Sequence, residues 1–193
     1  AVDTFFAYDG IEPIYQFVRG DIAYMCNISN GGFTVLNVAD KSNPVELSVT
    51  QYPGAAPHNA STTEDGRYLL TTDETEGGHL WIWDVSDPRR PSYVTEWSAH
   101  AGIIHNVTVR GDSAYIAYYT EGLQVLDISD PSFPLLVGSY DTWPFASGSF
   151  NGNWGVYPFA ASGNIYLSDI TSGLFVVRMA DGGHPALDFF VSA

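Results

Sequence analysis

Two histidines of this chain occupy equivalent places in its sequence pattern. His58 lies ten residues before Tyr68, and His105 lies ten residues before Tyr115. Each histidine is followed directly by an asparagine. The matching spacing indicates that the two imidazoles take the same position in two copies of one structural unit.

Carboxylates follow the tyrosines of the same pattern. Asp73 and Glu74 come five and six residues after Tyr68, and Asp169 comes three residues after Tyr166. If the tyrosine strands run antiparallel to the strands that the histidines begin, their ends lie at the same end of the fold. The pattern therefore predicts one polar rim made of His58, His105, Asp73, Glu74 and Asp169. Imidazoles with carboxylates suit a divalent transition metal ion or a general acid/base pair, whereas strand capping is the purely structural alternative.

A second candidate surface is the aromatic and glycine-rich segment TWPFASGSFNGNWGVY at 142–157. Aromatic rings on a loop can stack on a carbohydrate or a peptide beside the polar rim. The alternative is a packed lid over the edge of a sheet. The predicted ligand-binding residues are Trp143, Phe145, Phe150, Trp154 and Tyr157.

No catalytic signature accompanies these residues. The sequence contains no CxxC, HExxH or GxSxG motif and no glycine-rich phosphate loop. Its one cysteine, Cys26, excludes an internal disulfide and a cysteine-based zinc cage. The residue types thus permit metal or acid/base chemistry without indicating a reaction class.

The elements that must position these residues are repeats. One phrase recurs as FTVLNVADKSNP at 33–44, LWIWDVSDPRRP at 80–91, LQVLDISDPSFP at 123–134 and LFVVRMADGGHP at 174–185. A tyrosine-containing run precedes each phrase, and another apolar run follows its proline. Four strand-like runs in every 40–50 residues or so are typical of a propeller blade. We therefore predict an all-β fold, a β-propeller of four-stranded antiparallel blades.

The repeats also predict the organisation of the chain as one propeller domain. Four full blades are expected at about 11–54, 55–100, 101–148 and 149–193. Residues 1–10 resemble the fourth strand of a blade, so we expect them to be the outer strand of a preceding blade. This arrangement favours a larger propeller, completed by another copy of the chain or by a missing N-terminal fragment. A ring of four blades closed on itself is the alternative.

Composition restricts the partners. Twenty-two acidic residues oppose seven basic ones, for a net charge of −15, so nucleic acid is excluded as a partner. No apolar run approaches the roughly 18 residues that a membrane-spanning helix needs. Lys41 is the only lysine, and an acidic, lysine-poor chain suits an extracellular location.

Several stretches resemble a known family. DVSDP and DISDP, TEDGRYLLTTDE, HNVTVRGDSAYIAYYTEGLQVLDISDPS and WGVYPFAASGNIYLSDITSGLFVVR are similar to LVIVD-repeat β-propellers. More narrowly, residues 31–178 resemble the C-terminal half of the choice-of-anchor B family of surface proteins. The resemblance implies a secreted or cell-surface propeller with no defined biochemical activity. We therefore expect an interaction or scaffold module that binds a protein or glycan; the alternative is a metal-dependent, hydrolase-like enzyme around His58 and His105.

Overall fold

The computed structural model describes residues 15–99 and 102–179, together with the backbone of 187–190. Sixteen strands make up the described part, and a single turn of 3₁₀ helix at Ile28–Asn30 is its one helical element. No helix in this part is long and apolar enough to cross a membrane. The prediction of an all-β fold is confirmed.

The strands form four antiparallel sheets, each of four strands in chain order. The first sheet contains β1 (Tyr15–Arg19), β2 (Ile22–Asn27), β3 (Gly32–Asn37) and β4 (Val45–Gln51). The second contains β5 (Pro57–Thr62), β6 (Tyr68–Asp73), β7 (Leu80–Asp84) and β8 (Ser92–Trp97). The third contains β9 (Asn106–Arg110), β10 (Ser113–Ala117), β11 (Leu123–Asp127) and β12 (Leu135–Tyr140). The fourth contains β13 (Asn153–Tyr157), β14 (Ile165–Asp169), β15 (Gly173–Met179) and β16 (Leu187–Phe190).

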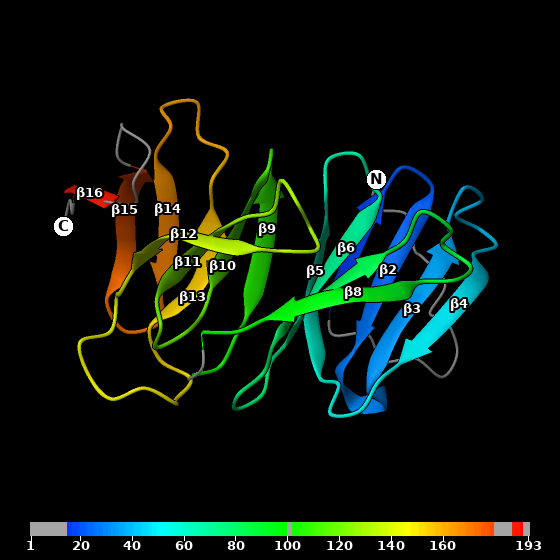
Figure 1. Cartoon of the computed structure of the whole chain (residues 1–193), viewed down its shortest axis with the longest axis horizontal. Helices are drawn as coiled ribbons and strands as arrows, with labels where there is room; N and C mark the ends of the chain where they lie inside the picture. The colour runs from blue at the N-terminus through cyan, green and yellow to red at the C-terminus, as the bar shows by residue number, and fades with distance from the viewer. Residues whose placement is uncertain (1–14, 100–101, 180–186, 191–193) are drawn as a thin grey trace.

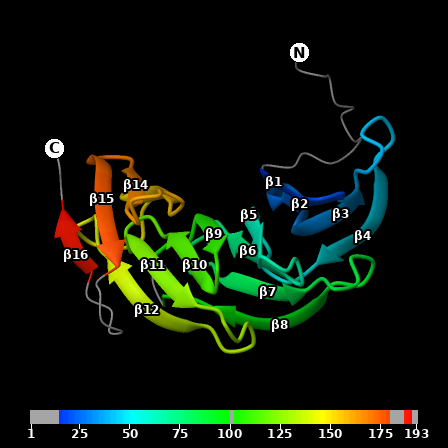
Figure 2. The same ribbon diagram turned by 90° about the horizontal axis from the view of Figure 1, so that it is seen from above.

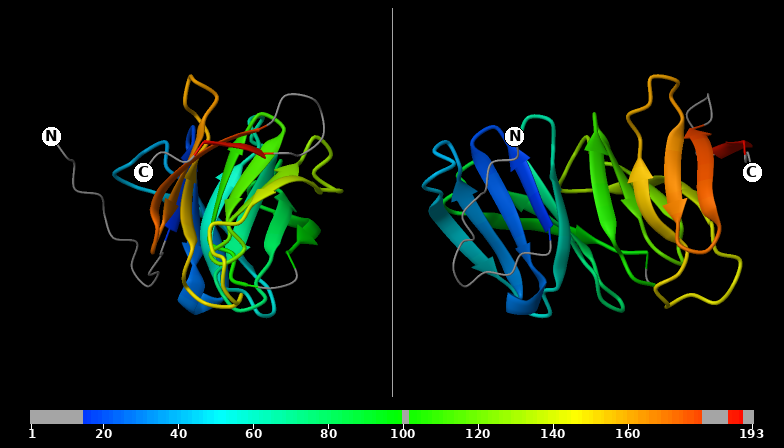
Figure 3. Two further views of the ribbon diagram at one scale, coloured as in Figure 1. Left: turned by 90° about the vertical axis from the view of Figure 1, so that its left-hand side faces the viewer. Right: turned by 180° about the vertical axis from the view of Figure 1, so that it is seen from behind.

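The four sheets are the blades of a propeller, set side by side along an arc (Figure 1). Figure 2 shows β1, β5 and β9 on the concave side of the arc and β4, β8 and β12 on its convex side. The first and fourth sheets lie at opposite ends, so the described residues form an open arc and not a closed ring of four blades (Figure 3). Each sheet falls inside one of the four ranges expected for a blade. The outer strand expected at 1–10 lies outside the described residues.

A separate apolar core fills each space between neighbouring blades. Phe33 and Val35 of the first blade pack with Leu69 and Trp83 of the second. Equivalent clusters join the second blade to the third and the third to the fourth. Cys26 is part of the first cluster, and burial raises the pKa of its thiol. Alternation along each strand sends one set of apolar side chains into each interface, which explains the β-branched and aromatic runs of the repeats.

Side chains of the innermost strands link each blade to the next. The Asn59 side-chain oxygen accepts a hydrogen bond from the Val107 backbone N–H at 3.0 Å. Asn106 Nδ2 donates in turn to the Trp154 carbonyl at 3.2 Å. The asparagines that follow the two histidines thus fix the relative position of neighbouring inner strands, and with it the position of the histidines themselves.

Candidate functional site

The two predicted histidines lie in contact at one end of the inner strands. His58 is in β5, and His105 directly precedes β9, where its N–H donates to the Ala117 carbonyl at 3.0 Å. The two imidazole rings are stacked, with centroids 4.3 Å apart and planes inclined by 28°. The equivalent sequence spacing therefore corresponds to equivalent positions in adjacent blades.

Glu74 joins the two histidines. It follows β6, and its Oε2 lies 3.0 Å from His58 Nδ1 while its Oε1 lies 3.6 Å from His105 Nε2. The side chains of His58, Glu74 and His105 are 16%, 14% and 2% exposed, respectively. One ligand atom from each residue lies within 4.8 Å of the others, and within the described part of the chain no other group of this kind occurs. These three residues are called the rim cluster below.

The orientation of the His105 ring is set by the neighbouring blade. Its Nδ1 lies 2.6 Å from the backbone carbonyl of Trp154, so this nitrogen carries the proton and donates it to that oxygen. Burial, followed by the electrostatic influence of the adjacent His58 ring, lowers the pKa of His105 to about 4. At neutral pH the ring is therefore uncharged, and Nε2 presents a lone pair to Glu74.

Glu74 is held ionised inside the rim cluster. Burial raises the pKa of its carboxyl group, but the contacts from His58 and Tyr119 outweigh burial and lower it overall. The Tyr119 hydroxyl donates to Glu74 Oε1 at 2.6 Å. Burial and the bond to Glu74 raise the pKa of the Tyr119 phenol, so it remains a hydrogen-bond donor.

Tyr119 is a site residue that the sequence analysis missed. It comes from the turn after β10 in the third blade, and its backbone φ of +35° is the one positive φ at a non-glycine residue in the described part. Such a conformation costs about 1–3 kcal/mol and persists where the surroundings enforce it. Its carbonyl accepts bonds from Gly122 and Asn153 N–H groups, which hold the turn in place.

Asp73 lies next to Glu74 in sequence but turns away from the histidines. Its carboxylate accepts hydrogen bonds from Tyr52 Oη at 2.8 Å, Trp81 Nε1 at 2.7 Å and the Ala56 N–H at 3.0 Å. Burial raises the pKa of Asp73 in spite of these three bonds. Its donors come from the first and second blades, so Asp73 braces the junction between them.

Asp169 is also separate from the rim cluster. It ends β14 in the fourth blade, and its Oδ1 accepts bonds from the N–H groups of Thr171 at 2.9 Å and Ser172 at 2.7 Å. The structure thus brings together three of the five residues predicted for the polar rim and places the other two in structural contacts.

The aromatic segment adjoins the rim cluster at two points. The Trp154 ring packs on His105 at 5.2 Å between centroids with its plane tilted by 34°, and Phe150 meets Tyr119 edge to face at 5.3 Å. Both rings remain about half exposed. Trp143 and Phe145 form a separate pair, with centroids 4.9 Å apart. The predicted rim and the predicted aromatic surface are therefore continuous through Trp154 and Phe150.

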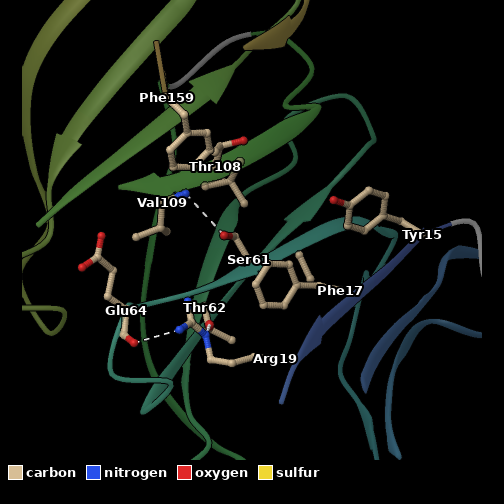
Figure 4. Close-up of a pocket in the computed structure, with 11 residues that line it drawn as sticks. Tyr15, Phe17, Arg19, Ser61, Thr62, Glu64, Thr108, Val109 and Phe159 are labelled. Atoms are coloured by element: carbon tan, nitrogen blue, oxygen red, sulfur yellow. Dashed lines mark hydrogen bonds between the residues drawn. The ribbon is translucent and has the colours of Figure 1, made fainter. Parts of the chain in front are cut away.

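A cavity of about 600 Å³ opens on the concave face of the arc (Figure 4). Its walls come from β1, β5, β9 and the segment after β13, and they combine aromatic rings, hydroxyl groups and two charged side chains. The lining residues are Tyr15, Phe17, Arg19, Ala60, Ser61, Thr62, Glu64, Val107, Thr108, Val109 and Phe159. Tyr157 packs on Phe159 at 5.6 Å, so β13 connects this cavity to the aromatic segment.

Internal bonds hold the charged wall of the cavity. Arg19 Nε donates to Thr62 Oγ1 at 2.6 Å, and its Nη1 donates to the Glu64 carbonyl at 2.8 Å (Figure 4). The Glu64 side chain accepts from the Gly111 N–H at 2.7 Å. Ser61 Oγ accepts from the Val109 N–H at 3.3 Å, which leaves its own hydroxyl proton free to donate into the cavity.

This arrangement defines a β-propeller with a polar cluster and an aromatic-lined cavity on its inner strands. Comparison with known families agrees: the LVIVD repeat model matches residues 101–142, which cover the third blade. No curated protein sequence is significantly similar to this chain.

Solved structures show the same fold. A protein from Lactobacillus plantarum superimposes with a TM-score of 0.75 at 20% identity, over 93% of this chain and 57% of that one. The Pseudomonas aeruginosa periplasmic gluconolactonase PpgL gives 0.67 at 13% identity, over 90% of this chain and 54% of that one. The β-propeller domain of Myceliophteria thermophila Cps50 (Swd1) gives a TM-score of 0.65 at 13% identity, over 90% of this chain and 58% of that one. The chain thus spans between about half and three fifths of these structures. Fold and family model together support an LVIVD β-propeller.

Proposed function

We propose that this chain is a secreted or cell-surface β-propeller interaction module that binds a glycan on its concave face. One observation carries the proposal: the cavity on the inner strands, in which aromatic rings and free hydroxyl groups face the same space (Figure 4). Its volume of about 600 Å³ is within the range of small-ligand sites.

The chemistry of the walls favours a sugar. Phe17 and Phe159 offer flat apolar faces, which pack against the C–H faces of a pyranose ring. Ser61 and Thr108 supply hydroxyl groups that exchange hydrogen bonds with those of a sugar. A purely apolar ligand would leave these hydroxyls without partners, at a cost of about 1–3 kcal/mol for each buried group.

The aromatic segment extends the surface beyond the cavity. Tyr157 contacts Phe159 at the cavity, and Trp154 of the same strand covers the rim cluster. Both side chains are about half exposed. A glycan longer than one sugar unit can therefore continue along β13 towards Trp154.

The amino-acid composition and the family resemblance support the proposed extracellular location. The net charge of −15 and the single lysine suit an extracellular milieu. The resemblance to choice-of-anchor B proteins implies surface display. Among the structural neighbours, PpgL is a periplasmic gluconolactonase.

A glycan array tests this function. The wild-type chain is expected to retain a restricted set of glycans, and Phe159→Ala is expected to weaken that binding at least tenfold. Phe133→Ala is the matched control, because Phe133 is 67% exposed and lies in the turn before β12, outside the cavity. Absence of glycan binding, or retention of a peptide ligand instead, overturns the assignment.

The rim cluster favours a second candidate function, a metal-dependent hydrolase. Two histidines and a glutamate, of which His58 and Glu74 are partly exposed, resemble the ligand sets of catalytic metal sites. A pH-stat assay with gluconolactone tests it, with Glu74→Gln as the inactive variant. No hydrolysis above the Glu74→Gln background removes this candidate.

We also propose that further polypeptide, in the form of another copy of the chain, completes the propeller. The two end sheets each have one neighbouring blade in the described arc, whereas the inner two have two (Figure 2). Obligate contacts of this kind bury well over about 1,000 Å². Light scattering should give a particle larger than one 21.0 kDa chain, and a stable particle of a single chain would overturn this proposal.

A further inference from the structure

The rim cluster contains an unbalanced polar contact. His105 uses Nδ1–H to bond the Trp154 carbonyl, so in the neutral ring Nε2 is an acceptor. The atom that Nε2 faces, Glu74 Oε1, is also an acceptor, at 3.6 Å. With the His105 side chain only 2% exposed, little water is available to separate them. Two facing acceptors call for a cation between them.

His58 presents a second available nitrogen to the same place. Its Nδ1 is buried and makes no hydrogen bond, although Glu74 Oε2 is only 3.0 Å away. The carboxylate oxygen therefore lies outside the direction in which the ring nitrogen would donate. A buried polar atom without a hydrogen bond requires an explanation, and an ion bound to it is one. In the rim cluster this nitrogen lies beside both Glu74 and His105, so three ligand atoms meet at one place.

We propose that His58, Glu74 and His105 bind one divalent transition metal ion of the Zn²⁺ type, with a fourth position open to solvent. Ligands at about 2.0–2.1 Å in a tetrahedral shell lie roughly 3.3 Å from one another. Each imidazole nitrogen is close to this distance from one oxygen of Glu74, His58 Nδ1 at 3.0 Å from Oε2 and His105 Nε2 at 3.6 Å from Oε1. The ligand atoms of all three residues lie within 4.8 Å of one another. For both imidazoles to coordinate one ion, the His58 ring must rotate out of its stack on His105. The His58 side chain is partly exposed, which leaves room for this rotation.

The surroundings match those of metal sites. The Trp154 carbonyl fixes one histidine from behind, and the Tyr119 hydroxyl holds the carboxylate, as outer-shell partners do around ligating residues. The net charge of −15 concentrates cations at the surface of the chain. The two outer-shell partners come from the third and fourth blades, so the ion would also fix three blades together.

This inference is independent of glycan binding. The cavity lies along the inner strands and shares no residue with the rim cluster. Loss of the metal site is therefore expected to leave the Phe159-dependent glycan binding intact, and each proposal can fail alone.

The experiment is titration of the metal-stripped full chain with Zn²⁺ alone by calorimetry, together with the absorption spectrum of the Co²⁺ form. The wild-type chain is expected to bind one equivalent and to unfold at a higher temperature with Zn²⁺ present. His58→Gln, Glu74→Gln and His105→Gln should each weaken binding by more than the 10–100-fold that outer-shell changes typically cause. Circular dichroism and the unfolding temperature without metal check that each variant is folded.

His79→Gln is the matched control. His79 also faces a glutamate, with 3.4 Å between its Nδ1 and Glu96 Oε2, and this Nδ1 likewise makes no hydrogen bond. The two side chains are more exposed than those of the rim cluster, at 36% and 39%, and no third ligand lies beside them in the described part of the chain. The control is expected to bind Zn²⁺ like the wild type. His58→Gln keeps the test decisive if the buried His105 variant fails to fold, because His58 is partly exposed. No stoichiometric binding, binding retained by His58→Gln and Glu74→Gln, or binding lost in His79→Gln would each overturn the proposal.

Discussion

The rim cluster and the turns that follow β3, β7 and β11 on the convex side are both built from polar residues of the repeats. The two regions differ in where the hydrogen-bond partners of these residues come from. In the turns, Asp40, Asp87 and Asp130 each accept a bond from the N–H two residues further on. In the rim cluster, Glu74 is bonded by Tyr119 of the next blade, and the His105 ring by a carbonyl of the blade after that. The repeated acids of the turns thus have partners within their own turn, whereas Glu74 and His105 have partners in other blades.

Asp73 and Glu74 show the same difference between adjacent residues. Asp73 is 3% exposed, and both of its oxygens accept hydrogen bonds from structural donors. Glu74 contacts two imidazoles and a phenol at the partly exposed end of the inner strands. Neighbouring carboxylates thus divide into one that holds blades together and one that is available for chemistry.

Asp73→Ala should produce the largest effect. It leaves the part-buried donors of Tyr52, Trp81 and the Ala56 N–H without their acceptor, and an unsatisfied buried group costs about 1–3 kcal/mol. We expect the free energy of unfolding to fall by at least about 3 kcal/mol in urea titrations. Asp73→Asn, which keeps part of the acceptor capacity, should lose less. A loss under about 1 kcal/mol for Asp73→Ala would remove the distinction between the two carboxylates.

The pH dependence of the free energy of unfolding should reveal the lowered pKa of His105. Its folded pKa of about 4 lies below the ordinary 6.5, so the unfolded chain takes up a proton as pH falls below 6.5 while the folded chain does not. Stability is therefore full above pH 6.5 and declines towards pH 4. For metal-free protein we expect a loss of about 2 kcal/mol between pH 7 and pH 5 from this group alone.

The control for this pH effect is His105→Gln. The groups facing His105 are His58, Glu74 and Tyr119, and the lowered pKa of Glu74 keeps its carboxylate ionised through this interval. Urea titrations in EDTA at the two pH values should show a clearly smaller decline for the variant. Equal declines in both proteins would mean that His105 is protonated as easily when folded as when unfolded.

The fold was largely predictable because its information is local and repeated. The alternation of apolar residues and the turn residues can be read within one blade, and the repeat period follows from comparing the copies. Together they predicted the four sheets. The same spacing argument placed His58, His105 and Glu74 at one rim. It could not separate Asp73 from Glu74, because which neighbour turns inward depends on where β6 ends and the chain bends.

The rest of the site depends on contacts between blades, which leave little trace in one sequence. Trp154 acts on His105 through a backbone carbonyl, and every residue type carries that group. Tyr119 reaches Glu74 from a turn with positive φ, a conformation that sequence patterns assign to glycine or asparagine. Asp169 had the right type and spacing, but the bonds to Thr171 and Ser172 occupy one of its oxygens.

The smallest effect is expected from Asp130→Ala on the convex side. Asp130 Oδ1 accepts bonds from the Ser132 hydroxyl at 2.6 Å and the Ser132 N–H at 3.0 Å, and these bonds lower its pKa. The side chain is exposed, so solvent replaces both bonds when it is removed. Scanning calorimetry should show an unfolding temperature within about 2 °C of the wild type, with Zn²⁺ titration unchanged. A drop as large as that of Asp73→Ala would mean that a repeated acid bonded only within its own turn stabilises the propeller as much as one shared between blades.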